Sequence, residues 1–220
     1  MTLGWDVLLP ILWESLGETL YMVSVTLLVG GFAGLLLGLA LYTTRKGNLF
    51  ASGPGFTVLN VLVNIVRPIP FIIFITAIGP LTLAVVGTTI GTQAAIFPMT
   101  LMATFATSRI VEQNLVALDP GVIEAARAMG ASRLRIVATV LVPEALGPLI
   151  LGYTFLFVGI VDMSAMVGAI GGGGLGDFAI VYGYQRFNWQ VTFITVVVIV
   201  VIVQLAQWLG NTLARRVLRR

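Results

Sequence analysis

The chain has 220 residues, of which 58% are hydrophobic and only 10% are charged, whereas a soluble globular domain carries roughly 45–50% apolar and about 25% charged residues. This composition excludes disordered and fibrous chains, and the small net charge of +3 does not indicate a nucleic-acid-binding protein, so the lipid bilayer is the expected solvent. Histidine and cysteine are both absent, which removes disulfides, thiolate nucleophiles and the usual base near neutral pH.

The residues before the first long apolar run carry Asp6, Glu14 and Glu18 and no basic residue. A cleavable signal peptide begins with a positively charged region, so this pattern does not indicate one. We expect a short helix in the membrane interface here, with Trp5 and Trp13 at the depth of the lipid headgroups.

Five segments are apolar enough to cross a membrane, because a spanning helix needs about 20 mostly apolar residues. Only helices or closed barrels satisfy the backbone in lipid, and these runs lack the alternation of a barrel strand. We therefore expect an all-α integral membrane protein that forms one transmembrane domain over 1–220. Its spans are predicted at about 19–42, 56–78, 93–111, 146–170 and 190–212, and the short apolar piece 81–86 is expected at an interface.

The first span contains Gly30, Gly34 and Gly38, spaced four residues apart on one helix face. Small residues at this spacing let two helix backbones approach closely. The partner is either another helix of the same chain or a second copy of the chain, and the pattern alone leaves both open.

Charged residues fall inside predicted spans, among them Arg67 in the second and Asp162 in the fourth. Such residues are costly in lipid and need a partner or a watery lining. Arg67 precedes Pro68-Ile69-Pro70, which should break the helix and free backbone carbonyls. One interpretation is a broken helix beside a pathway, with Arg67 and Asp162 paired. The alternative is that Arg67 lies near the membrane surface and extends its side chain to water.

The loop 112–145 predicts two short helices rather than a simple linker. Asp119 and Pro120 suit the N-cap and the first position of a helix, and Gly130 can end it in the left-handed conformation. Ser132 can cap a second helix over 133–142. Pro143 is then expected to interrupt the helix before the fourth span begins. Together, the two helices are predicted to form a helical hairpin under the membrane.

Basic residues indicate the orientation, since cytoplasmic loops are enriched in lysine and arginine. With five crossings, one side carries Arg186 alone, while the other carries the loops 43–55 and 112–145 and the C-terminal tail. The N-terminus is therefore expected outside and the C-terminus in the cytoplasm. The basic residues on the cytoplasmic side are Arg45, Lys46, Arg127, Arg133, Arg135, Arg215, Arg216, Arg219 and Arg220.

The hairpin resembles the EAA loop of ABC importer permeases, which reads Glu-Ala-Ala, three residues, Gly, nine residues, Ile-x-Leu-Pro. This chain has Glu124-Ala125-Ala126, Gly130 and Val140-Leu141-Val142-Pro143 at that spacing. Further segments are similar to the methionine importer permeases, and the likeness covers nearly the whole chain after about residue 15. These segments are 64–71, 123–131, 164–166, 173–176 and 182–184. Asp162 and Arg186 are departures that can tune the substrate.

The resemblance implies a type I ABC importer permease in a bacterial cytoplasmic membrane. Two copies would form the pathway, two ATPase subunits would dock below, and an extracytoplasmic binding (lipo)protein would deliver methionine, as either stereoisomer, or a close analogue. The chain itself would bind no cofactor, because ATP and Mg belong to the partner ATPase. The residues implied for ATPase coupling are Glu124, Ala125, Ala126, Gly130 and Pro143.

Substrate-pathway residues are less sharply indicated, and adaptable methionines also suit plain helix packing. The candidates for a pathway or gate are Arg67, Phe71, Asp162, Met163, Ser164 and Met166. Another amino acid or small polar solute is the alternative substrate. An intramembrane enzyme or a scaffold is the alternative from another class. The enzyme would need a catalytic centre, which no pair of residues within the spans supplies. A scaffold would not need the hairpin.

Overall fold

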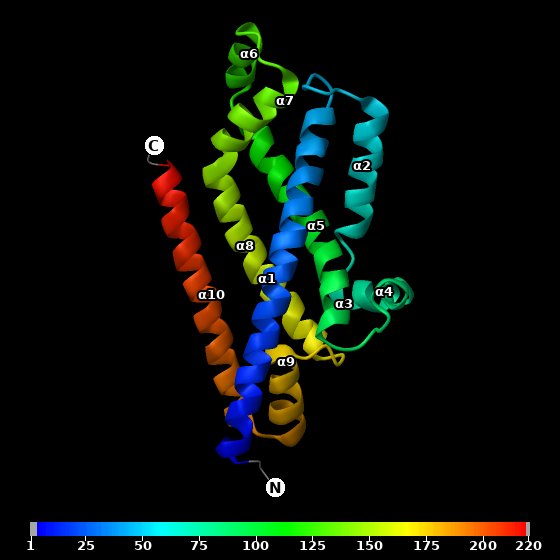
Figure 1. Ribbon diagram of the computed structural model, residues 1–220, viewed down its shortest axis with the longest axis vertical. Helices are drawn as coiled ribbons and strands as arrows, with labels where there is room; N and C mark the ends of the chain where they lie inside the picture. Colours follow the sequence, from blue (N-terminus) through cyan, green and yellow to red (C-terminus); the bar gives the residue numbers. More distant parts are fainter. Residues whose placement is uncertain (1–3, 219–220) are drawn as a thin grey trace.

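The computed structural model describes residues 4–218, which contain helices, turns and no strand (Figure 1). The long helices are α1 (Trp5–Thr44), α5 (Thr92–Val116), α8 (Val142–Gly168) and α10 (Trp189–Leu218). The short helices are α2 (Gly53–Val66), α3 (Phe71–Ala77), α4 (Gly79–Val86), α6 (Pro120–Ala128), α7 (Arg133–Ile136) and α9 (Gly174–Asp177). Two π-helical turns, Val137–Leu141 and Phe178–Gly183, and the 3-10 turn Tyr184–Arg186 complete the described chain.

The predicted all-α membrane fold is confirmed. α1, α5, α10 and the stretch Arg133–Gly168 are each long and apolar enough to cross a membrane. α2 and α3 together are also long and apolar enough, with a bend of 104° between them, and count as a fifth crossing when the bent pair is taken as one span. The helices α6 and α7, the connection from α1 to α2 and the C-terminal end of α10 lie toward one end of the bundle (Figure 1). The beginning of α1 and α9 lie at the other end; the tail residues Arg219 and Arg220 lie outside the described part.

The expected separate interfacial helix at the N-terminus is wrong, because α1 runs without a break over 40 residues. Pro10 lies near its beginning, and no later residue interrupts the backbone hydrogen bonds of the helix. The early part of α1 also has a buried face, where Leu8 and Leu12 pack with Phe178 and Val191. This packing holds the N-terminal turns in line with the span instead of letting them lie in the interface.

The glycine face of α1 packs against α5 of the same chain. A Cβ atom on Gly30, Gly34 or Gly38 would lie 2.8, 2.7 or 2.6 Å from a carbonyl oxygen of α5. Those oxygens belong to Thr100, Thr104 and Ser108, which repeat every four residues. The spacing therefore marks a close intramolecular seam, and α5 occupies the face that a second copy would need.

The second predicted span is broken where the prolines predicted it. α2 ends at Val66 and α3 begins at Phe71, because Pro68 and Pro70 cannot donate the backbone hydrogen bonds of a continuous helix. The apolar piece 81–86 is part of α4, which ends at Gly87 with a φ of 85°. Arg67 follows the last residue of α2 and therefore lies about 20 Å along the helix axis from the start of α2. The start of α2 is at the end of the bundle that carries α6 and α7, so Arg67 lies away from that end.

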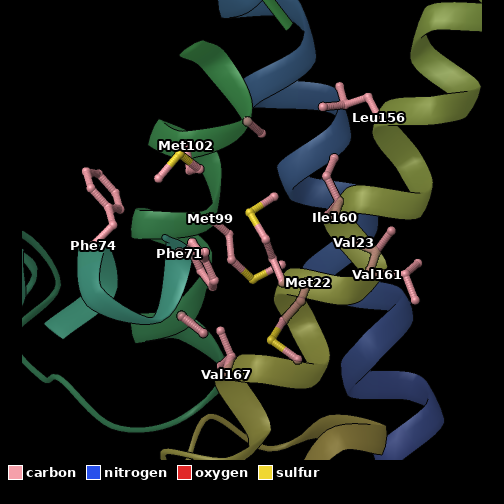
Figure 2. Close-up of a cluster of buried hydrophobic side chains, with 13 residues drawn as sticks. Met22, Val23, Phe71, Phe74, Met99, Met102, Leu156, Ile160, Val161 and Val167 are labelled. Carbon is pink, nitrogen blue, oxygen red and sulfur yellow. The ribbon is translucent and has the colours of Figure 1, made fainter. Parts of the chain in front are cut away.

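The central core joins four elements (Figure 2). Methionines of α1 and α5 meet the two phenylalanines of α3 and aliphatic side chains of α8, as Figure 2 shows. This cluster fixes the short helix α3 against the bundle although α2 itself is thinly packed. Its labelled members are Met22, Val23, Phe71, Phe74, Met99, Met102, Leu156, Ile160, Val161 and Val167.

The glycine-rich segment after α8 is tightly turned and tied to α1. Gly171, Gly173 and Gly174 have positive φ values of 83°, 80° and 79°, a conformation that favours glycine. Glu18 accepts a hydrogen bond from the Gly174 N–H at 2.6 Å. Burial, together with the nearby negative charge of Glu18, raises the pKa of the Asp177 carboxyl. The segment is thus a structural closure of the bundle at the end where α1 begins.

Candidate functional site

The hairpin formed by α6 and α7 begins with the predicted cap. The Asp119 side chain accepts a hydrogen bond from the Gly121 N–H at 2.8 Å, and Pro120 occupies the first helical position. This arrangement satisfies a backbone donor that the first turn leaves free. The chain leaves α5 at Val116 and enters α6 at Pro120, so the hairpin is joined to a spanning helix through a very short connection.

Gly130 forms the turn of the hairpin, as the sequence predicts. Its φ is 78°, its N–H donates to the Arg127 carbonyl at 2.9 Å, and the next N–H, of Ala131, donates to the Ala126 carbonyl at 3.1 Å. These two bonds are the Schellman pattern that closes a helix C-terminus. Ser132 then caps α7 through the Arg135 N–H at 3.4 Å. The turn therefore has a single defined shape.

A hydrophobic base holds the hairpin onto the bundle. Residues from both arms of the hairpin are buried against the nearby ends of α1, α5 and α8, which makes the hairpin part of the helical body rather than a loose loop. The buried members of this cluster are Tyr42, Leu49, Val111, Leu115, Ile123, Ala126, Ile136, Leu141, Ala145 and Leu149.

The outer surface of the hairpin carries Glu124 and Ala125, which are both exposed. Met129 and Leu134 are also exposed, with 81% and 73% of their surface accessible. Ala126 differs from the sequence-based expectation, because it is only 3% exposed and packs inward. It supports the joint from beneath, so of the two alanines only Ala125 is open to a partner.

Pro143 does not interrupt the helix, contrary to the prediction. The helix continues from Arg133 to Gly168 through the π-helical turn Val137–Leu141. A proline ring clashes with the carbonyl four residues earlier, and a widened π turn at that place relieves the clash. The second arm of the hairpin is consequently one rigid rod with α8.

The six pathway candidates separate into two groups. Phe71 and Met163 are each 9% exposed and belong to the central core, and the buried Ser164 donates its hydroxyl to the Val161 carbonyl at 2.7 Å. Arg67, Asp162 and Met166 are exposed. Among residues 4–218, both ion pairs centre on Glu112, so Arg67 and Asp162 are not paired with each other.

Asp162 lies on an open face of α8. Exposed residues recur along this helix every three or four positions, which places them on one side. No other helix of the described chain covers that side, and its carboxylate is the charged group within it. The exposed residues of this face, which we call the α8 face, are Leu151, Phe155, Gly159, Asp162, Met166 and Ala169.

A cluster of five polar side chains was missed from the sequence. Arg109 of α5 contacts Glu112 and donates to Asn60 and Asn64 of α2 at 2.9 and 2.6 Å. Arg45, after α1, donates to the same Glu112 at 3.4 Å. Arg109 lies inside the predicted span 93–111 and is followed three residues later by an acid, a signal that could have marked it. We call these five residues the Arg109 cluster.

The broken second span, the apolar bundle and the rigid exposed hairpin together define an importer permease. The family model described as "Binding-protein-dependent transport system inner membrane component" matches residues 30–219, so the chain belongs to this family. The chain is accordingly a transport subunit and not an enzyme, and it is a multi-pass inner membrane protein.

Two relatives and one solved structure are similar over nearly the full length. The "Probable D-methionine transport system permease protein MetI" of Vibrio cholerae is 43% identical, covering 96% of this chain and 92% of the relative. The "Methionine import system permease protein MetP" of Bacillus subtilis is 40% identical, covering 95% and 94%. A chain of the inward-facing MetNI methionine ABC transporter is 40% identical, covers 98% of this chain and 99% of its own, and superposes with a TM-score of 0.94.

Proposed function

We propose that this chain is the permease subunit of an ATP-driven importer that moves D- or L-methionine, or a close analogue, across the cytoplasmic membrane. The observation that carries the proposal is the near-complete superposition on the MetNI methionine transporter at a TM-score of 0.94. The two methionine permeases that cover over nine-tenths of the chain support the same substrate.

The complete importer contains two copies of this chain, two ATPase subunits and an extracytoplasmic binding (lipo)protein. ATP and Mg bind to the ATPase, so this chain holds no cofactor. The N-terminus lies outside and the C-terminus in the cytoplasm, which puts the hairpin on the side of the ATPase. Closure of the ATPase dimer pushes the hairpin, and the rigid rod from Arg133 to Gly168 carries that movement into the membrane by rocking of packed helices.

Growth of a suitable host tests this function directly. A methionine auxotroph without its own importer is supplied with this chain, its ATPase and its binding protein. We expect growth on limiting methionine, since the importer concentrates it, and no growth when this chain alone is omitted. Failure of the complete set to restore growth, with all subunits present in the membrane fraction, would contradict the proposed substrate.

Asp162 offers a contact that methionine shares with the alternative substrates, another amino acid or a small polar solute that carries an amine. Its carboxylate lies on the open α8 face, where a passing ammonium group is a suitable partner. The gate would then combine this charge with the thioether of Met166, while Phe71, Met163 and Ser164 support it from the core. Arg67 lies at the break of the second span, where freed backbone groups also face the pathway.

Replacing Asp162 by asparagine is expected to lower the rate of uptake by about tenfold, because a charge-assisted bond to the substrate is lost. Asp162→Glu keeps the charge and should retain most of the rate. The measurement is initial uptake of labelled methionine, with other amino acids as competitors. If Asp162→Asn changes neither the rate nor the order of competitors, Asp162 has only a structural part.

A further inference from the structure

The Arg109 cluster joins three segments that are distant in the sequence. Arg109 donates from one terminal nitrogen, Nη2, to both Asn60 and Asn64 of α2, at 2.9 and 2.6 Å. Its other terminal nitrogen contacts Glu112 on the next turn of α5. Glu112 in turn accepts from Arg45 after α1 at 3.4 Å. A single guanidinium thus forms bonds to two helices at once, which its planar fork of donors allows.

Glu112 sets the direction in which that guanidinium points. The side chain of Glu112 is 3% exposed and that of Arg109 is 15% exposed, so both charges are largely removed from solvent. A buried ion pair is weak evidence for stability, but it can specify one arrangement of the surrounding elements. Here the specified arrangement is the placement of α2 against α5.

Within one copy of the chain, α2 has few other buried contacts. Only Val63 is buried among its 14 residues, while Val58 and Ile65 expose 67% and 62% of their surfaces. Asn60 and Asn64 are four residues apart and therefore share one helix face, the face that meets Arg109. Polar bonds across a helix–helix contact contribute to the association of helices in membrane proteins.

Arg109 and Glu112 of the cluster also lie along the chain between the break of the second span and the hairpin, which the proposed cycle displaces. α5 leads within a few residues into the hairpin at Pro120, and α2 leads into the break before Phe71. We infer that Arg109, oriented by Glu112, is a positioning residue for transport that makes α2 follow α5 when the hairpin is displaced. The predicted effect on transport rests on the proposed function, whereas the predicted placement of α2 against α5 does not.

The first test measures coupling in the reconstituted importer with its ATPase and binding protein. Asn60→Leu with Asn64→Leu removes both acceptors, and the number of substrate molecules moved per ATP should fall by about tenfold, as expected for a lost bond to a charged group. ATP hydrolysis should stay within about twofold, since the hairpin is untouched. Asn64→Asp keeps the acceptor oxygen and should retain coupling. Asn211→Leu, an exposed asparagine on α10, is the matched control.

The second test follows the distance between the helices and needs no substrate. The chain has no cysteine, so spin labels can be attached at Val58→Cys on α2 and Gln113→Cys on α5, which are both exposed, in importers assembled from one labelled and one unlabelled copy. We expect one narrow distance distribution with and without ATP, and a broad one in Asn60→Leu/Asn64→Leu. A distance that changes with ATP in the parent chain, or one that stays narrow in the double variant, overturns the inference. If the double variant does not insert, Arg109→Lys, which keeps the charge but loses the fork, replaces it in both tests.

Discussion

Gly34→Val is expected to lower the thermal stability of the folded chain strongly. Any Cβ atom at this position would lie 2.7 Å from the Thr104 carbonyl oxygen of α5, and a helix backbone cannot yield as a flexible side chain does. Overpacking of a dense core costs about 1–3 kcal/mol and sometimes more, and this site is at the upper end because α1 and α5 touch along their whole seam. We expect the melting temperature to fall by roughly 10 °C.

The thermal stability of the detergent-purified importer, followed by loss of monodisperse protein on heating, measures this effect. Gly17→Val is the matched control, because Gly17 lies on the same helix and a Cβ there meets nothing within 4 Å. The control should melt with the parent protein. Equal stability of the two valine variants would show that the α1–α5 seam is not as close as described.

Gly130→Pro is expected to separate ATP hydrolysis from transport while the chain still inserts. Proline cannot adopt the φ of 78° found here, and it lacks the N–H that Gly130 donates to the Arg127 carbonyl. The hairpin must then change its turn, which displaces Glu124 and Ala125 relative to the membrane. Strain at such a position costs about 1–3 kcal/mol, so transport per ATP should fall by about tenfold or more.

Gly130→Asn is the control for this effect, since asparagine tolerates the left-handed conformation and keeps the N–H. Uptake and ATP hydrolysis are measured in the same vesicles, and the asparagine variant should couple nearly as well as the parent. Glu124→Ala tests the contact surface without altering the turn and should also lower the ratio. Normal uptake in both Gly130→Pro and Glu124→Ala would refute the role of the hairpin in coupling.

The hairpin could be predicted from the sequence because its signals are local. Asp119, Pro120, Gly130 and Ser132 each act on backbone groups within a few residues, and capping rules describe such contacts. The break at Pro68 and Pro70 is local in the same sense. The beginning of each hairpin arm and the break of the second span were therefore predicted correctly, whereas the end of the second arm was not.

The errors concern features that depend on packing between distant segments. The unbroken beginning of α1 depends on packing against Phe178 and Val191, which lie far along the chain. The continuous helix through Pro143 depends on a π turn, which no residue pattern predicts. Arg109 finds its acceptors 45 and 49 residues away, so its partners become visible only in the fold.

The α8 face shows a further limit of sequence reasoning. A list of polar or adaptable residues in the fourth span cannot separate those that face inward from those that face outward. Helical spacing becomes decisive only when the packing of the helix is known, and it then places Asp162 and Met166 outward and Met163 and Ser164 inward. Of the candidates in the fourth span, Asp162 and Met166 are therefore the exposed ones, and their place at a pathway stays a prediction.

The central claim is that this chain forms the methionine pathway of an ATP-driven importer. The most direct test is uptake of labelled methionine into vesicles that contain this chain, its ATPase and its binding protein, with competing amino acids outside. The proposal predicts accumulation that requires ATP, is suppressed by unlabelled methionine far more than by other amino acids, and disappears with Gly130→Pro. Accumulation suppressed equally by unrelated amino acids, or unaffected by ATP, would contradict it.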